Sequence, residues 1–434
     1  MNKNMSSGVV PMVDHVKSQT PLVVSADAYF CGNEFRGEAL GMAPAISITG
    51  GSVIFERCKF INTFRNEIRG GQKHKFINCE FIFERSVAHP PSAKLSQFGL
   101  YIGGGKDIEI LGAYMSGHRL DALKPALNTS NIKIAQTTVE DCGVSPEEAT
   151  RLGCTSVAGD GIDTYGSGNI ISLTDFTARS IYGAAFESKT NVAINPGQGI
   201  VGDIQITNLY AEDVAFGISH ENIDALDHPT GPDFPGIRPD AQRITISGAI
   251  IKRPLWYGAF LNGRHLVATG LHILDAGREG IVLYVSARDV DLIAPHVVGC
   301  SKFAPGKLPG ITIKGAQDCS IVGGVIDGDG GVVNGAAISR HRSAIEVLDY
   351  NPANKAENLS IDKVRVRRWS ATGSPGIGFF CTPKSAIVNQ IMAGSPNGSP
   401  GAHGGPGSLC FDSVTGRVWR QNGAANTKSW VMIP

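Results

Sequence analysis

Three carboxylates of this chain have the spacing that acid–base chemistry requires. Glu187 and Glu221 each stand four residues after a Gly that opens a short apolar strand, and Asp163 lies on the preceding strand. If such strands stack in register, Glu187 and Glu221 are about 5 Å apart at the backbone. Their carboxyls can then span roughly 5–9 Å, which covers both retaining and inverting glycoside hydrolysis. Close like charges also raise one pKa, as a general acid requires.

Other side chains on the same face could hold a sugar. Residues of a strand alternate between its two faces, so the fourth residue after each Gly points outward. The predicted outward column is Tyr165, Glu187, Glu221, Asn262, Tyr284 and Lys314. Aromatic rings stack on sugar faces and amides bond hydroxyl groups. Lys189 also points outward, and Lys189 or Lys314 could act as the base of an elimination instead.

The elements that carry these residues belong to a repeat. A polar residue followed by two apolar residues one position apart recurs in DIEILG (107–112), RITISG (243–248), DVDLIA (289–294) and six further copies. The shortest steps between copies are 22–24 residues, and longer steps are the same unit plus an insertion. Two or three short strands per such unit predict an all-β, right-handed parallel β-helix. Nine copies, extended backwards by Cys58 and Cys79, give about eleven rungs. SPEEATRL (145–152) is the best helical fragment, with Ser145 as its N-cap.

Composition excludes several classes of protein. Lys+Arg and Asp+Glu both number 39, which argues against a dedicated nucleic-acid binder. There is no apolar run of about 18 residues and no apolar segment near the start, so neither membrane insertion nor a secretory signal is expected. The nine cysteines form no CxxC pair, and we expect no metal and no cofactor. The cysteines are expected to be buried small hydrophobes, although a Cys58–Cys79 bridge is geometrically possible.

The ends differ from the repeat. Residues 1–45 are expected to form an attachment or cap segment, 46–393 the β-helix, 394–407 a Gly/Pro linker and 408–434 a small tip of three strands. Three short strands cannot bury a core alone, so Trp419 and Trp430 are expected to be exposed unless copies of the chain associate. The acidic insertion 221–240 could wall a groove, bind a cation or be a solvated loop.

The C-terminal segment resembles a piece that recurs at the ends of phage tail fibres and tailspikes. The matching residues are GSL at 407–409, Asp412, Gly416, VWR at 418–420, NG at 422–423 and SW at 429–430. Together with the repeat, the chain resembles a phage tailspike of the pectate-lyase-like superfamily. The GDGxxDDTxAIQ-type motif with which many tailspikes begin their helix is absent, which leaves the mode of N-terminal attachment open.

This resemblance implies a homotrimer on the virion, made in the host cytoplasm, that docks on other tail or baseplate proteins. It also implies binding to a bacterial surface polysaccharide. Three functions remain open on the sequence. The favoured one is a depolymerase, more readily a glycoside hydrolase than a lyase, with Glu187, Glu221 and Asp163 as catalytic carboxyls. The second is a receptor-binding adhesin that cuts nothing, and the third is a free polysaccharide lyase or epimerase.

Overall fold

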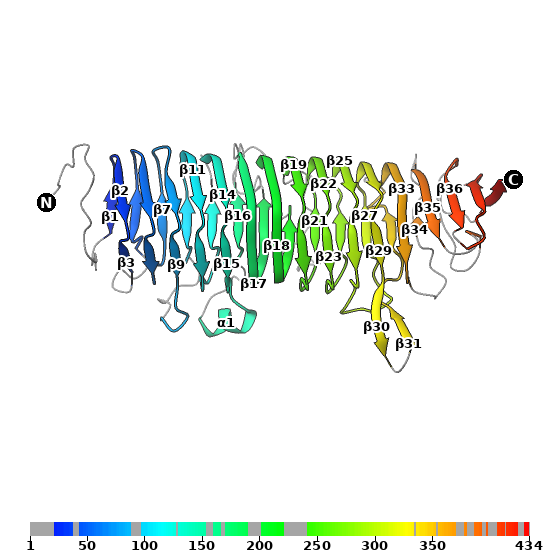
Figure 1. The fold of residues 1–434 in the computed structure, drawn as a ribbon, viewed down its shortest axis with the longest axis horizontal. Coiled ribbons are helices and arrows are strands. Elements are labelled where there is room, and N and C mark those ends of the chain that lie inside the picture. Colours follow the sequence, from blue (N-terminus) through cyan, green and yellow to red (C-terminus); the bar gives the residue numbers. More distant parts are fainter. Residues whose placement is uncertain are drawn as a thin grey trace. The chain divides into compact units, whose positions relative to one another are not determined.

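The computed structural model arranges the chain as short strands that stack in parallel from one coil to the next, with antiparallel strands at the C-terminal end (Figure 1). The residues described are 21–37, 43–87, 97–126, 129–152, 159–165, 170–189, 201–220, 241–333, 336–352, 355–369, 377–379, 386–392, 396–397, 406–412, 414–423 and 429–433. The chain divides into two compact units, Met1–Ala215 and Phe216–Pro434, and each is described by itself. The all-β parallel β-helix expected from the repeat is confirmed.

The first unit has three parallel sheets, to which each coil contributes in turn. One sheet stacks β1 (Leu22–Val24), β4 (Ile46–Ile48), β7 (Asn66–Ile68), β10 (Leu100–Ile102), β13 (Leu123–Pro125), β16 (Ile162–Tyr165) and the end of β17 (Ile171–Lys189). The second stacks β2 (Ala28–Cys31), β5 (Val53–Glu56), β8 (Lys75–Ile77), β11 (Gly105–Leu111), β14 (Thr129–Ala135) and the start of β17. The third stacks β3 (Glu34–Arg36), β6 (Lys59–Ile61), β9 (Glu80–Ile82), β12 (Tyr114–Ser116), β15 (Thr138–Glu140) and the middle of β17.

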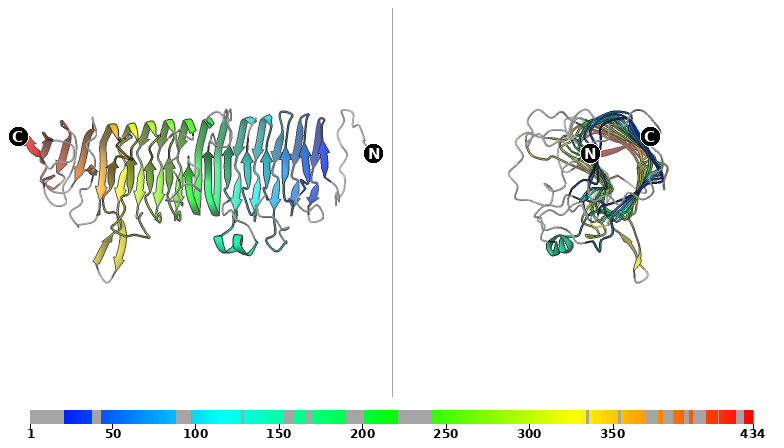
Figure 2. Two further views of the ribbon diagram at one scale, coloured as in Figure 1. Left: turned by 180° about the vertical axis from the view of Figure 1, so that it is seen from behind. Right: turned by 90° about the vertical axis from the view of Figure 1, so that its left-hand side faces the viewer.

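The second unit repeats this plan after β18 (Val201–Ser219), which spans the boundary. One sheet continues from the end of β18 through β21 (Ala259–Leu261), β24 (Ile281–Leu283), β27 (Ile311–Lys314), β32 (Ile345–Leu348) and β34 (Ile377–Phe379). The next stacks β19 (Ala241–Ser247), β22 (Arg264–Thr269), β25 (Arg288–Ile293), β28 (Gln317–Val322), β33 (Glu357–Arg367) and β35 (Ala386–Met392). The last stacks β20 (Ile250–Lys252), β23 (His272–Leu274), β26 (His296–Val298), β29 (Val325–Asp327) and the end of β33. Strands β30 (Asp329–Val333) and β31 (Ala336–Ser339) form an antiparallel hairpin that projects from these sheets (Figure 2).

Ladders of like side chains fill the interior of each unit. In the first unit, the stacked rings of Phe55 and Phe76 have centroids 5.1 Å apart, and those of Phe60 and Phe81 are 4.5 Å apart. In the second unit the ladder is aliphatic, and Cys319 pairs in it with Val290 on one side and Leu359 on the other. Because a single coil cannot cover such a row, the stacking itself creates the core.

The polar residue that opens each copy of the repeat lies at a corner of its coil, and the backbone conformation there explains its type. It has a positive φ in every described copy, namely Asp107, Asn131, Asp203, Arg243, His265, Asp289, Asp318 and Asn358. Asn and Asp tolerate this left-handed conformation better than other non-glycine residues. Successive corner side chains also bond one another, as Asn131 Nδ2 does with Asp107 Oδ1 at 2.6 Å.

The start of the coils and the placement of two cysteines differ from the sequence expectation. Strands β1 to β3 lie inside the predicted cap segment and pair in parallel with the next coil, so the coils begin before residue 46. Cys58 and Cys79 do not continue the apolar row of the repeat, because Ile110 of that row pairs with Phe76, and Phe76 pairs with Phe55. Both cysteines are buried and unbridged.

The predicted helical fragment is confirmed as α1 (Pro146–Arg151), where the Ser145 side chain accepts a hydrogen bond from the Glu148 N–H at 3.1 Å. In the part of the chain that the structure describes, no helix is long and apolar enough to span a membrane.

The C-terminal tip covers its own tryptophan. Strand β36 (Leu409–Asp412) pairs in parallel with β35, and β37 (Val418–Gln421) and β38 (Trp430–Ile433) add antiparallel strands. Trp430 is 3% exposed and packs on Cys410, with Trp419 and Trp369 partly buried against them. The expectation that a single chain leaves both Trp419 and Trp430 exposed is therefore wrong, because the last coil provides the surface on which the three-stranded tip packs.

Candidate active site

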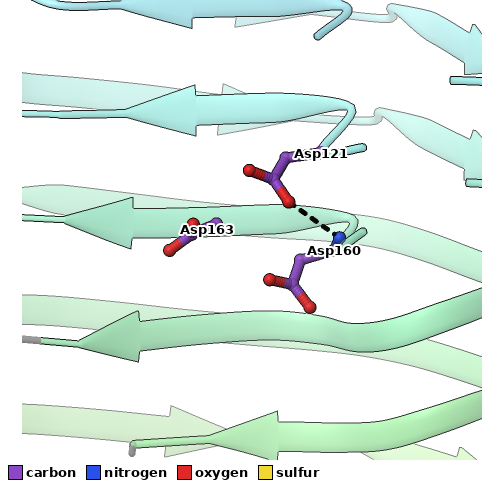
Figure 3. A group of neighbouring side chains, drawn as sticks. All are labelled: Asp121, Asp160 and Asp163. Atoms are coloured by element: carbon purple, nitrogen blue, oxygen red, sulfur yellow. Dashed lines mark hydrogen bonds between the residues drawn. The ribbon is translucent and has the colours of Figure 1, made fainter. Parts of the chain in front are cut away.

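Three successive coils of the first unit bring charged side chains together at one edge. The turn before β13 and β13 itself contribute one acid and one lysine, the turn before β16 and β16 contribute two acids, and the end of β17 contributes one acid and one lysine. We call this group the acid–lysine cluster: Asp121, Lys124, Asp160, Asp163, Glu187 and Lys189. Figure 3 shows its three aspartates. The register fixes the neighbours, because Leu123 pairs with Ile162 and Asp163 pairs with Glu187.

Two of the aspartates tie the turns of adjacent coils to one another. The Asp160 N–H donates to Asp121 Oδ1 at 3.0 Å, and Asp160 Oδ1 accepts from the Ala184 N–H at 2.6 Å. Gly183 is needed here, since a Cβ at that position would lie 2.1 Å from Asp160 Oδ1. The local backbone therefore holds the Asp160 carboxyl in one place before any ligand arrives.

The two lysines bridge the remaining acids. Lys124 Nζ lies 2.9 Å from Asp121 Oδ2 and also contacts Asp163 Oδ2. Lys189 Nζ lies 3.2 Å from Asp163 Oδ2 and 2.5 Å from Glu187 Oε2. The four acids are at most 3% exposed, whereas the lysine side chains are 20% and 18% exposed. The lysines therefore form the solvent side of the cluster.

The surroundings lower the pKa of Asp163 and raise the pKa of Asp160 and Glu187. Burial is the largest influence on Asp163, yet Lys124 and Lys189 outweigh it and hold the pKa of Asp163 below its ordinary value. Burial raises the pKa of Asp160 well above its ordinary value, and the charges of Glu187 and Asp121 raise it further. Burial also raises the pKa of Glu187. Asp163 is therefore the ionised member, with protonatable carboxyls beside it.

Asp160 and Glu187 behave as one pair. Both carboxyls are buried, and the charge of Glu187 raises the pKa of Asp160. Two neighbouring buried acids resist ionising together, so this pair favours a state that keeps at least one proton. A pair that shares a proton next to an ionised carboxylate is an arrangement that can both give and take protons.

The aspartates also have the donor set of a hard cation. Asp121, Asp160 and Asp163 each offer a carboxylate oxygen, and these oxygens lie within 4.8 Å of one another. Asp163 Oδ1 is buried without a hydrogen-bond partner. However, the ammonium of Lys124 already stands between Asp121 and Asp163. We therefore attribute the charge balance of this cluster to its lysines.

The structure brings together Asp163, Glu187 and Lys189 among the predicted site residues. Glu221, the expected partner of Glu187, lies outside the described residues. The predicted column is displaced by two residues at its start, because Tyr165 pairs with Lys189 and not with Glu187. The prediction counted from Gly161 on this strand. The Gly183 N–H donates to the Gly159 carbonyl, so Gly159 is the residue equivalent to Gly183.

The remaining predicted residues lie in the second unit. Phe260 pairs with Val282 and Val282 with Thr312, and this register places Asn262, Tyr284 and Lys314 in successive coils. Sequence reasoning missed Asp121, Lys124 and Asp160. The signal for Asp160 was the GDG at 159–161, which is a turn and at the same time presents the carboxyl. The segment DALK at 121–124 gave no signal, because Leu120 stands at the position equivalent to Gly159.

Comparison with known proteins finds distant structural likenesses. The chain is similar to the A-module of the mannuronan C-5 epimerase AlgE6 of Azotobacter vinelandii, with a TM-score of 0.43 and 11% identity over 82% of this chain and 91% of that one. It is also similar to tailspike protein 3 of bacteriophage CBA120, with a TM-score of 0.38 and 13% identity over 96% of this chain and 63% of that one. For the Dettilon tailspike protein the TM-score is 0.35 and the identity 12%, over 93% and 68% of the two chains. No family model and no curated protein matches the sequence. What the chain has in common with these structures is the parallel β-helix, and the chemistry rests on its own residues.

Proposed function

We propose that the protein is a phage tailspike that binds a bacterial surface polysaccharide and hydrolyses its glycosidic bonds at the acid–lysine cluster. One observation carries the proposal: the carboxylate of Asp163, held ionised by Lys124 and Lys189, stands beside Asp160 and Glu187, two buried carboxyls whose pKa values are raised. Glycoside hydrolysis requires one carboxyl that donates a proton and one that is ionised. The resemblance of the C-terminal tip to tail-fibre ends supports the tailspike assignment. With it we propose a homotrimer on the virion that docks on other tail or baseplate proteins.

The roles follow from the protonation states. The proton held by the Asp160–Glu187 pair passes to the leaving oxygen while Asp163 attacks the anomeric carbon, and water then releases the sugar from Asp163. Asp163 Oδ2 and Glu187 Oε2 both contact Lys189 Nζ, so these oxygens are less than about 6 Å apart. Retaining glycosidases hold their carboxyls roughly 5–5.5 Å apart and inverting ones roughly 6.5–9.5 Å. We therefore expect retention of the anomeric configuration.

An elimination driven by a lysine base is disfavoured. Burial lowers the pKa of Lys124 and Lys189, but the surrounding carboxylates outweigh it and raise both values above the ordinary one. A lysine that stays an ammonium at neutral pH cannot abstract a proton. In the cluster, these lysines instead keep Asp163 ionised.

Binding without cleavage is the second candidate function. The observation that favours it is the near-complete burial of the four acids, which is also the state of a structural ion cluster. In that case the cluster only holds the coils together, and the polysaccharide is recognised elsewhere.

The test is incubation of the full chain with capsule, exopolysaccharide and O-antigen preparations. Polymer size, new reducing ends and the ultraviolet absorbance of unsaturated sugars would be followed. We expect smaller polymers with new reducing ends and no absorbance, and nuclear magnetic resonance should show retention in the first product.

Asp163→Asn and Glu187→Gln should lower the rate of cleavage at least about 100-fold. The matched control is Asp107→Asn, because Asn131 already occupies the equivalent corner of the next coil. A polysaccharide that the chain binds but never cuts would refute the hydrolase and support the adhesin. Cleavage accompanied by the ultraviolet absorbance of unsaturated sugars would show a lyase.

A further inference from the structure

A second group of side chains, in the second unit, has the chemistry of a ligand site. We call it the tyrosine–lysine cluster, and it consists of Tyr284, Lys314 and Tyr350. Tyr284 directly follows β24 and Lys314 ends β27, and these two strands pair from Ile281 with Ile311 to Leu283 with Ile313. Lys314 pairs in turn with Leu348 at the end of β32, and Tyr350 follows two residues later. Three successive coils thus contribute one side chain each.

The geometry places the ammonium between two aromatic rings. Lys314 Nζ lies 5.6 Å from the ring centroid of Tyr284 and 5.4 Å from that of Tyr350. The two rings are 5.4 Å apart and nearly perpendicular, at 78°. Tyr284 also packs against Phe260 of the preceding coil, with centroids 5.0 Å apart. Tyr284 therefore has an aromatic neighbour from an earlier coil and one from a later coil, and all three side chains of the cluster remain partly open to solvent.

The cluster differs from the acid–lysine cluster in its charge. Lys124 and Lys189 each contact two carboxylates. Among the residues that the structure describes, Lys314 forms no ion pair with a carboxylate, and its recorded contacts are the two rings. Cation–π attraction orients the ammonium without neutralising it. A half-buried cation of this kind keeps its attraction for an incoming anion.

We propose that the tyrosine–lysine cluster binds a sugar residue that carries a carboxylate. A tyrosine ring offers a face for the C–H side of a pyranose, and Lys314 Nζ pairs with the carboxylate of the same residue. A neutral sugar satisfies only the first of these interactions. The inference rests on the proposed function in that the ligand is a polysaccharide, and it adds that this polysaccharide is acidic.

The test is binding of the full chain to acidic oligosaccharides by calorimetry. The probes are oligogalacturonate, sialyl and pyruvylated oligosaccharides, each with its counterpart in which the carboxyls are reduced to alcohols. We expect at least one acidic probe to bind roughly tenfold more tightly than its reduced counterpart, as a charged hydrogen bond would give. Lys314→Gln should abolish that difference, and Lys314→Arg should keep most of it.

Two further variants separate local from general effects. Tyr350→Leu should weaken acidic and reduced probes alike, since it removes a stacking face and keeps the cation. Lys307→Gln is the control, because Lys307 is an exposed lysine of the same unit and should change nothing. Failure of every acidic probe to bind, or equal binding by Lys314→Gln, overturns the inference.

The same measurements distinguish this inference from the proposed function. A chain that binds an acidic probe through Lys314 but cuts no polymer refutes the hydrolase and keeps the site. A chain whose cleavage and binding are both indifferent to Lys314→Gln refutes the site and keeps the hydrolase. Asp163→Asn should retain the binding difference, because Asp163 belongs to the other cluster.

Discussion

Replacing Asp163 by Asn should destabilise the first unit, whereas replacing Asp160 by Asn should leave its stability unchanged or raise it. Both side chains are buried, at 3% and 1% exposure, and both substitutions swap a carboxyl for an amide of the same shape. A difference in their effects therefore reports protonation and charge rather than packing. Few pairs of positions in one cluster allow so direct a comparison.

The Asp163→Asn variant loses an ionised group that lies between two ammonium groups. Lys124 would keep Asp121 and Lys189 would keep Glu187, but both lysines would lose their contact with Asp163. Breaking a buried ion pair by removing one partner costs about 3–5 kcal/mol. The lowered pKa of Asp163 also means that this stability is present above the ordinary Asp pKa. It is lost as the pH falls through the lower pKa of the folded protein.

The Asp160→Asn variant resembles the protonated carboxyl that it replaces. Its amide oxygen can still accept from the Ala184 N–H, and it carries no charge for Glu187 and Asp121 to repel. Because the folded pKa of Asp160 is raised, the wild-type chain loses stability as the pH rises from the ordinary Asp pKa towards the folded one. That loss is about 1.4 kcal/mol for each pH unit. The variant has no such loss, so its advantage over the wild type should grow as the pH rises above the ordinary Asp pKa, until Asp160 is ionised in the folded chain.

The assay is urea unfolding at several pH values. It should be followed by far-ultraviolet circular dichroism, because all four tryptophans, Trp256, Trp369, Trp419 and Trp430, lie in the second unit. We expect a lower midpoint for Asp163→Asn and an equal or higher one for Asp160→Asn. Equal destabilisation by both substitutions at every pH would show that the two carboxyls have the same charge state, and the acid–base assignment would fail.

Three further outcomes are expected. Gly183→Ala should lower both the rate of cleavage and the urea midpoint, because the added Cβ would lie 2.1 Å from Asp160 Oδ1 and 2.8 Å from the Gly159 carbonyl oxygen; polymer size and circular dichroism check this. Phe55→Ala should cost about 3–5 kcal/mol in urea unfolding because Phe55 is fully buried in the aromatic ladder, whereas Phe303→Ala, at a site 53% exposed, should cost far less. Trp430→Ala should loosen the tip within each chain and leave the oligomeric state unchanged in light scattering, since Trp430 packs on Cys410 of its own chain.

Much of the fold could be predicted because its determinants are local. The repeat period requires coils of similar length, and the polar residue that opens each copy occupies a corner with positive φ. The alternation along each strand placed Asp163 and Glu187 on the same side as Lys189. The turn residues of the tip predict strands at 409–412, 417–420 and 429–433, and the three observed strands lie within one residue of these positions.

The tertiary structure decided which side chains meet. Asp121 and Lys124 are separated from Asp160 and Asp163 by an insertion that contains α1, so their contact follows from the register and not from the period. The register also paired Asp163 with Glu187, because Gly159 and not Gly161 is the counterpart of Gly183. The protonation state of each acid also depends on the tertiary structure, because its pKa is set by burial and by the charges on the neighbouring coils. The sequence by itself determined the coils and the faces, whereas only the stacking of the coils set the charge state of each acid.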